Sequence, residues 1–265
     1  DKLVFGTVTF NFDTIAHRLK ELAFLNAGLK INLIDTRVGK EKEKHYCFRG
    51  GIKDFVKYSN EGKTPVFDEP ILFKGEYNGI RAEAAIQYTD SYNENTVSFV
   101  NNIPTKEGGT HETGFRTALT KVLNDYARRT EVLKEKDPNF NGEDFREGMT
   151  ADISIKMQNI QFEGQTKSKL GSVEARPAVE AIISEQFEKF LDDPKNQVIG
   201  GIILQKAVAA AKVREAAKKA KDIARKKNSL DVTALVGKLA FCTGKKAEQN
   251  ELIIVEGESA GGSAK

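Results

Sequence analysis

Residues 251–265 place the tightest constraint on what this chain can fold into. Four consecutive apolar residues, 252–255, are typical of a strand buried on both faces of a parallel sheet. Glu256 and Glu258 follow with one glycine between them, and the small residues after them predict a tight turn that opens a helix. Ligands bind beyond the carboxyl ends of strands in open α/β sheets, and two nearby carboxylates suit a hard cation such as Mg²⁺.

The same segment carries a recognisable motif. Residues 256–265, Glu-Gly-Glu-Ser-Ala-Gly-Gly-Ser-Ala-Lys, resemble the Glu-Gly-Asp-Ser-Ala-Gly-Gly-Ser-Ala-Lys signature that opens the TOPRIM domain of bacterial type IIA DNA topoisomerase B subunits. A nucleotide-binding glycine turn of an unrelated α/β enzyme is the alternative. Glu258 departs from the family aspartate, and its extra methylene either alters the metal geometry or leaves it intact.

The bulk composition describes a soluble globular protein with a highly charged surface. Of 265 residues, 39% are apolar and 30% charged, and this length allows one large or two ordinary domains. No apolar run is long enough for a membrane span, and no signal peptide is visible. Cys47 and Cys242 have no metal-ligand spacing, so we expect no disulfide framework and a cytoplasmic location.

The two ends of the chain suggest a segment of a longer protein. The chain begins at Asp1 without a methionine, inside what looks like a strand. It stops inside the glycine-rich turn, where the expected strand has no sheet to join. We therefore expect residues beyond both ends, and much of the function to depend on them.

Hydrophobic periodicity predicts interleaved strands and helices. Asp13 is the expected cap of the first helix. Because no regular βαβ spacing recurs, the predicted fold class is α+β. The expected strands cover residues 7–12, 29–37, 45–48, 81–89, 96–102 and 149–157, and the expected helices cover residues 14–26, 52–56, 111–129, 174–191 and 195–227.

The last expected helix is strongly basic. Between residues 206 and 227 nine side chains are basic and two are acidic, although the formal net charge of the whole chain is only +3. A solvated face is one explanation, but such a face usually mixes signs, so contact with the phosphates of duplex DNA is favoured. The absence of interleaved aromatic residues argues against stacking on single strands. The expected DNA-binding residues are Lys212, Arg214, Lys218, Lys219, Arg225 and Lys226.

Residues 162–171 are predicted to form a flexible loop that contains two glycines. Gln165, Thr166 and Lys167 are adjacent in this loop. A lysine on a mobile loop can reach a phosphate as a point charge, and a glutamine can orient that phosphate or a water. Most loops of this composition are only solvated, so the tripeptide is a weak signal by itself.

His111 invites a catalytic interpretation because it begins an expected helix. No serine or cysteine nucleophile accompanies it in the sequence. A histidine at a helix start often only forms a hydrogen bond with the backbone, so we interpret His111 as structural.

The topoisomerase resemblance extends over nearly the whole chain. Residues 165–167 look like the Gln-Thr-Lys loop of the transducer domain of these B subunits. Residues 236–242, Val-Gly-Lys-Leu-Ala-Phe-Cys, are similar to the Pro-Gly-Lys-Leu-Ala-Asp-Cys of the gyrase members, as are residues 50–53, Gly-Gly-Ile-Lys. The topoisomerase IV members come close behind, because residues 105–114 are similar to them as well.

The resemblance implies a domain division and a set of site residues. Residues 1–235 would form the transducer domain, a ribosomal-protein-like α+β sandwich that ends in the long basic helix, and residues 236–265 would form a linker and the start of TOPRIM. Gln165 and Lys167 would contact ATP, with Lys167 at the γ-phosphate. Glu256 would bind Mg²⁺ and assist DNA cleavage.

The resemblance also implies partners and an activity. The parent enzyme would couple ATP binding and hydrolysis to the passage of double-stranded DNA past the basic helix. The topoisomerase A subunit would be its partner in an A2B2 heterotetramer, while this segment alone is expected to be catalytically inert. The alternative of a different class is a non-enzymatic module that binds DNA through the basic helix alone.

Overall fold

The computed structural model of the chain describes residues 1–6, 8–233, 246–256 and 262, and the side chains of all of these except 226–233 and 247. The described chain divides into two units, Asp1–Ala211 and Lys212–Lys265. Helix α6 (Gln197–Thr233) begins in the first unit and continues into the second. None of the helices in the described ranges has the length and hydropathy needed to cross a membrane.

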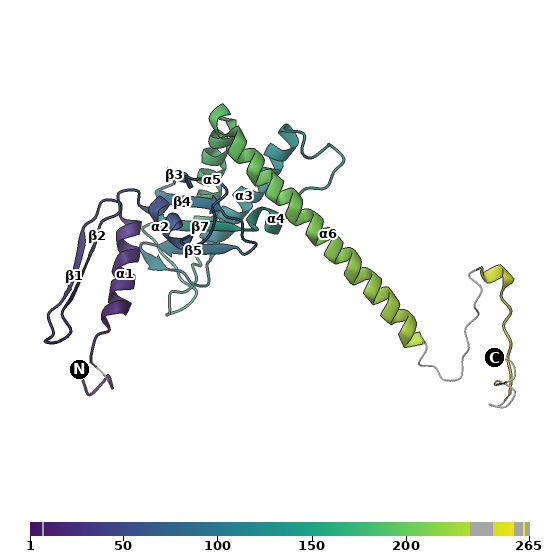
Figure 1. The fold of residues 1–265 in the computed structure, drawn as a ribbon, viewed down its shortest axis with the longest axis horizontal. Coiled ribbons are helices and arrows are strands. Elements are labelled where there is room, and N and C mark those ends of the chain that lie inside the picture. Colours follow the sequence, from purple (N-terminus) through teal and green to yellow (C-terminus); the bar gives the residue numbers. More distant parts are fainter. Residues whose placement is uncertain (7, 234–245, 257–261, 263–265) are drawn as a thin grey trace. The chain divides into compact units, whose positions relative to one another are not determined.

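A five-stranded mixed sheet organises the first unit (Figure 1). Its order is β3-β4-β7-β5-β6, and only the β5–β7 pair is parallel. The predicted strands at residues 81–89 and 96–102 are therefore not neighbours, because β7 lies between them. The strands are β3 (Ile71–Tyr77), β4 (Ile80–Tyr88), β5 (Asn95–Val100), β6 (Ile103–Pro104) and β7 (Met149–Lys156).

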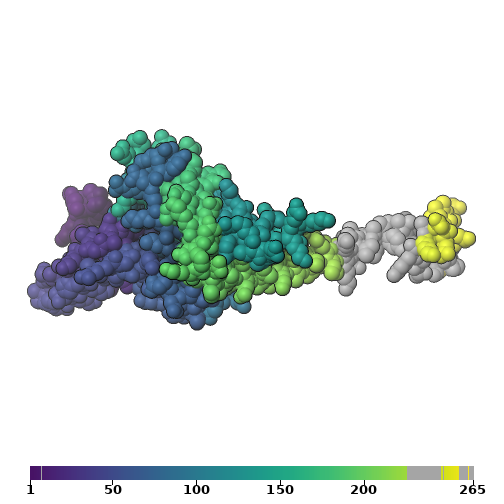
Figure 2. Space-filling view, turned by 90° about the horizontal axis from the view of Figure 1, so that it is seen from above, coloured from purple at the N-terminus to yellow at the C-terminus, as the bar shows by residue number. Residues whose placement is uncertain are grey.

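One face of the sheet is covered by α3 (Thr110–Arg129), α5 (Ala175–Asp192) and the start of α6. In the space-filling view the green atoms of α5 and of the start of α6 lie next to each other (Figure 2). Because side chains alternate along a strand, every second residue of β4 and β7 enters this core. The fully buried members include Phe73, Phe115, Ile153, Ile155 and Phe187.

The opposite face is covered by α1 (Phe12–Leu25) and α2 (Ile52–Ser59). An aromatic cluster joins these helices to the sheet. The ring of Phe24 stacks on those of Phe48 and Phe55, with centroids 3.7 and 4.9 Å apart, and Phe55 lies 5.9 Å from Phe99 of β5. A separate hairpin of β1 (Ile31–Asp35) and β2 (Lys42–Tyr46) follows α1 and lies beside that helix (Figure 1).

The mixture of helices with a largely antiparallel sheet agrees with the α+β prediction, but several local predictions were wrong. Residues 8–11 form no strand, and Asn11, not Asp13, caps α1 by accepting a hydrogen bond from the backbone of Thr14. Strand β3 lies between residues 57 and 80, where neither a strand nor a helix was predicted. The short helix α4 (Gly142–Arg146) lies in the charged segment for which no helix was predicted.

The C-terminal unit differs most from the prediction. The basic helix begins directly after a 3₁₀ turn, η1 (Pro194–Asn196). It continues through Thr233, beyond its predicted end at residue 227. Residues 252–255 form no strand, and the side chains of Leu252 and Ile254 are 87% and 86% exposed. A strand needs backbone partners, and no described residue pairs with this segment. A 3₁₀ turn η2 (Ala247–Gln249) precedes it, and residues 236–245 of the expected linker lie outside the described residues.

Candidate functional site

The loop that carries Lys167 is attached at its base to the segment that leads into α3. Leu170 is fully buried, its N–H donates to the carbonyl of Gly108 at 3.0 Å, and its carbonyl accepts from the N–H of Thr110 at 3.1 Å. Gly109 between them has φ of 143°, and a Cβ there would lie 2.4 Å from the carbonyl oxygen of Leu170. This close backbone approach requires glycine at position 109.

The two limbs of the loop are also bonded to each other. The N–H of Glu163 donates to the carbonyl of Lys169 at 3.0 Å, and the N–H of Gly171 donates to the carbonyl of Gln161 at 2.8 Å. An exposed ion pair of 3.0 Å joins the ammonium of Lys169 to the carboxylate of Glu163. The base is therefore a short ladder, and only residues 164–168 extend beyond it.

The tip of the loop presents Gln165, Thr166 and Lys167 to solvent. A turn closes the tip, because the N–H of Lys167 donates to the carbonyl of Gly164 at 3.1 Å. Lys167 has φ of +54°, the left-handed conformation that is uncommon for residues with a side chain. An exposed cation on an unusual but well-bonded turn is suited to contact an anion that arrives from outside this unit.

Ser168, the residue after Lys167, is bonded twice to Glu107. The hydroxyl of Ser168 donates to a carboxylate oxygen of Glu107 at 2.8 Å, and the N–H of Glu107 donates to the carbonyl of Ser168 at 2.9 Å. The hydroxyl of Thr166 lies 3.2 Å from that of Ser168. We call the pair of bonds between residues 107 and 168 the Glu107–Ser168 clamp.

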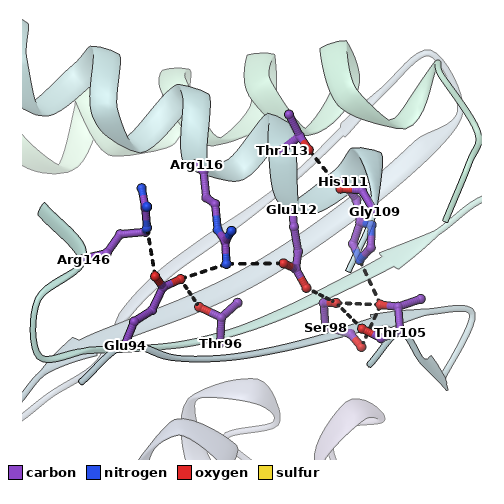
Figure 3. A network of polar contacts seen from close by, with 10 residues as sticks. All are labelled: Glu94, Thr96, Ser98, Thr105, Gly109, His111, Glu112, Thr113, Arg116 and Arg146. Atoms are coloured by element: carbon purple, nitrogen blue, oxygen red, sulfur yellow. Dashed lines mark hydrogen bonds and ion pairs between the residues drawn. The ribbon is translucent and has the colours of Figure 1, made fainter. Parts of the chain in front are cut away.

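A polar network continues from this segment along the start of α3 (Figure 3). The hydroxyl of Ser98 donates to the carboxylate of Glu112 at 2.6 Å and lies 2.5 Å from the hydroxyl of Thr105. The hydroxyl of Thr105 in turn lies 3.1 Å from Nε2 of His111. These bonds fix the turn from β6 into α3, on which Glu107 lies.

His111 is fully buried within this network. Burial lowers the pKa of its imidazole to about 4, because desolvation disfavours the charged form. The ring is therefore neutral near pH 7, and its one bonded nitrogen contacts Thr105. This environment agrees with the structural interpretation of His111.

Sequence reasoning did not single out the charged end of the same network. Glu94 accepts from Arg116 at 3.0 Å and from Arg146 at 2.9 Å, and Arg116 also lies 3.6 Å from Glu112 (Figure 3). The two arginines line an open hollow of about 700 Å³ on the outer side of α3, together with Lys121. The spacing of arginine, threonine and lysine along α3 was the one feature of the sequence that could have indicated this polar hollow. The contact with Glu94 could not be predicted, because it depends on the fold.

The basic residues predicted to bind DNA lie on α6. The side chains of Lys212, Lys218, Lys219 and Arg225 are exposed, and that of Arg214 is half-buried. The backbone of Lys226 belongs to the helix, but its side chain lies outside the described ones. The lysine-rich part of the helix is thus not turned into the core.

The six predicted residues do not share one face of α6. At 3.6 residues per turn, Arg214, Lys218 and Arg225 fall within roughly 60° of one another around the helix axis, together with Lys221. Lys221 is exposed and was not among the predicted contacts. Lys212 and Lys219 lie on roughly the opposite side. We call the set of residues 214, 218, 221 and 225 the four-cation face.

The predicted metal site is not assembled by the described residues. Glu256 is exposed, and Glu258 lies outside the described residues. Among the residues that the structure describes, no three His, Cys, Asp or Glu side chains come together in a group that could hold a metal ion. One exposed carboxylate supplies only part of the octahedral oxygen shell of Mg²⁺, and the other oxygens would come from other groups and from water.

Comparisons with known proteins agree on one family. The family model described as DNA gyrase B matches residues 51–223. The chain is 52% identical over its whole length to the DNA gyrase B protein of Streptococcus pneumoniae serotype 4 and 51% identical over 98% of its length to that of Enterococcus faecalis. It spans 40% of the length of each of these two relatives.

Solved structures show the same relationship. A structure of the 43K ATPase domain of Thermus thermophilus gyrase B, in complex with an aminocoumarin, matches 84% of this chain and 59% of that domain, with a TM-score of 0.74 and 36% identity. The topoisomerase IV ATP-binding domain of Francisella tularensis shares the fold, with a TM-score of 0.67 and 24% identity over 81% of this chain and 57% of that one. The chain belongs to the DNA gyrase B family.

Proposed function

We propose that this chain is the segment of an ATP-dependent type IIA DNA topoisomerase B subunit that couples nucleotide state to DNA passage. The observation that carries the proposal is the loop tip, where Lys167 and Gln165 are exposed on a turn that is bonded at its base. The gyrase members are favoured over the topoisomerase IV members, because the matching family model and the curated relatives are gyrase B.

The chemistry of the loop tip fits the terminal phosphate of ATP as substrate. The ammonium of Lys167 supplies a point charge that stabilises negative charge on a phosphate, and the amide of Gln165 can donate to a phosphate oxygen or orient a water. Two side chains do not bind a nucleotide by themselves. The remaining contacts therefore come from parts of the parent protein outside this chain.

The basic part of α6 supplies the proposed DNA contact. Its exposed cations suit the sugar-phosphate backbone of a duplex, which gives binding without sequence preference and with strong salt dependence. The gyrase A subunit is the proposed protein partner, in an A2B2 assembly, and the cytoplasm is the expected compartment. The transducer and TOPRIM division at residue 235 and Mg²⁺ binding by Glu256 remain predictions.

Replacement of Lys167 tests the nucleotide role in a full-length protein that carries this chain, assembled with its A subunit. We expect Lys167→Ala to lower ATP turnover by roughly 10²- to 10³-fold, because it removes one charge that stabilises the developing transition state. Nucleotide binding, measured by equilibrium titration, is expected to fall much less.

Lys169→Ala is the matched control, since it removes a lysine from the same loop that is paired with Glu163. It is expected to keep turnover within about twofold of the unaltered protein, because an exposed ion pair contributes little. Equal turnover of the Lys167→Ala variant and the unaltered protein would contradict the nucleotide role. If DNA binding persisted in that case, this chain would be better described as a DNA-binding module that takes no part in ATP turnover.

A further inference from the structure

We infer that Glu107 and Ser168 are positioning residues for Lys167, and that their clamp holds the lysine backbone in the conformation that aims its side chain outward. The inference rests on the proposed nucleotide role of Lys167. It adds two residues that touch no substrate, on a segment 61 positions before the loop in the sequence.

The backbone of Lys167 needs such support. A left-handed φ of +54° is unfavourable for a residue with a Cβ, and it persists only where neighbouring contacts determine the chain direction. On the N-terminal side, the bond from its N–H to Gly164 fixes the turn. On the C-terminal side, the next residue is Ser168, so the clamp fixes the other end of the same turn.

In the clamp each of the two residues donates one hydrogen bond to the other. One bond joins the backbone of Ser168 to the backbone of Glu107, and the other joins their side chains. Two bonds between the same two residues restrict both the position of Ser168, the residue after Lys167, and the rotation of the peptide that follows Ser168. A bond to a carboxylate is also stronger than a neutral one, so the side-chain bond contributes to the hold.

The clamp is anchored to the rigid part of the unit. Glu107 lies two residues before Gly109, whose backbone passes against Leu170, and two residues after Thr105, which is bonded to Ser98 of β5. The loop tip is thus connected to the sheet through a short, fully bonded route. Ion pairs at the loop base, such as Lys169 with Glu163, do not lie on this route.

The test uses turnover of ATP by the full-length protein assembled with its A subunit. Ser168→Ala and Glu107→Ala are each expected to lower kcat by roughly 3- to 10-fold, the range that the loss of one hydrogen bond gives. The KM for ATP is expected to change less than kcat. The double variant is expected to match the single ones, because the two residues act as one unit.

Two controls separate positioning from a general loss of charge or fold. Glu163→Ala also removes one carboxylate beside the loop but leaves the clamp intact, so kcat is expected to stay within about twofold. Ser168→Thr keeps the hydroxyl and is expected to restore most of the turnover. Amide hydrogen exchange over residues 164–170 is expected to accelerate in the alanine variants and not in the threonine variant.

The outcomes distinguish this inference from the proposed function. If Lys167→Ala abolishes turnover while Ser168→Ala, Glu107→Ala and the double variant leave kcat unchanged, the positioning role is wrong and the nucleotide role stands. If Lys167→Ala has no effect, the nucleotide role itself fails, and with it the inference. Additive losses in the double variant would also overturn the clamp, because independent residues add.

Discussion

At the scale of single residues, Lys167 combines a left-handed backbone with an exposed cationic side chain. Loop composition predicted that its side chain is exposed, and the family motif predicted that it acts together with Gln165. The sequence did not predict the left-handed turn, because lysine has no preference for that conformation. Nor did it predict Glu107 as a partner of the loop, since that pairing joins segments 61 positions apart.

A second unusual residue is Asp152, in the middle of β7. It is fully buried, and neither of its carboxylate oxygens has a hydrogen-bond partner among the described residues. It lies between Ala85 of β4 and Val97 of β5 on the face that α1 and α2 cover. Burial raises the pKa of this carboxyl well above its usual range, because the charged form loses its hydration.

The raised pKa of Asp152 predicts that the fold becomes less stable as pH rises. Below about pH 4 the carboxyl is protonated in both the folded and the unfolded chain, so it has no effect on the pH dependence. Above that pH the unfolded chain releases the proton while the folded chain retains it, until the raised pKa is reached. Over that window the group lowers the free energy of unfolding by up to about 1.4 kcal/mol per pH unit.

Urea unfolding of the chain and its variants between pH 4 and 8 measures this contribution. The free energy of unfolding of the unaltered chain minus that of Asp152→Asn is expected to decrease as pH rises, because asparagine does not titrate. Asp90→Asn, which removes a carboxylate from an exposed position, is the control for the loss of one acidic side chain. A difference for Asp152→Asn that does not change with pH would show that the carboxyl is ionised at little cost in the folded chain.

At the scale of elements, patterns of hydrophobicity predicted the helices better than the strands. Helix α3 begins and ends within a residue of its prediction, because its apolar positions recur at helical spacing. Strand β3, by contrast, lies in a stretch for which no strand was predicted. The neighbours of β5 were also not predictable, since the pairing of β5 with β7 depends on the crossover through α3.

Helix α6 shows a different limit of sequence patterns. Ile203, Ala207 and Ala210 recur at helical spacing and are buried, but Ala217 and Ala224, which continue the same spacing, are exposed. Alanine occurs both in cores and on solvated helices, because it favours the helix in either place. The alanine spacing therefore did not reveal where packing against the first unit ends.

The four-cation face predicts an unequal effect of charge reversal around α6. In the full-length protein, Lys218→Glu with Arg225→Glu is expected to weaken binding of duplex DNA and to reduce the slope of log affinity against log salt by about 0.9 for each phosphate that is no longer neutralised. Lys212→Glu with Lys219→Glu changes the charge equally on the opposite side and is expected to have the smaller effect. Binding is measured by a salt titration with a short duplex.

Equal effects of the two pairs would indicate a diffuse electrostatic attraction and contradict a specific face. If neither pair altered DNA binding, α6 would not be the DNA-binding element at all. Both pairs are expected to leave the melting temperature within about 2 °C of the unaltered protein, because exposed substitutions rarely change stability. A larger shift would mean that these side chains support the fold.

At the scale of the whole molecule, the chain divides into two units, and the buried hydrophobic clusters of the described residues all lie in the first. The apolar residues 252–255 were predicted to form a buried strand, and the structure leaves them exposed. A sequence pattern signals that a segment can be buried, but burial requires a partner surface, and no described residue supplies one. The family relationship follows from the chain itself. The chain spans only 40% of the length of its Streptococcus pneumoniae relative, so the activity of the whole protein is a proposal for this chain.

The nucleotide role of Lys167 is tested most directly by affinity labelling of the full-length protein with an ATP derivative that carries an acyl group on its γ-phosphate. A lysine amine beside that phosphate attacks the acyl carbon, forms an amide and releases ATP, and peptide mapping then identifies the labelled residue. We expect Lys167 to be labelled and excess ATP to prevent the labelling. Labelling of Lys169 to the same extent, or none at Lys167, would contradict that role.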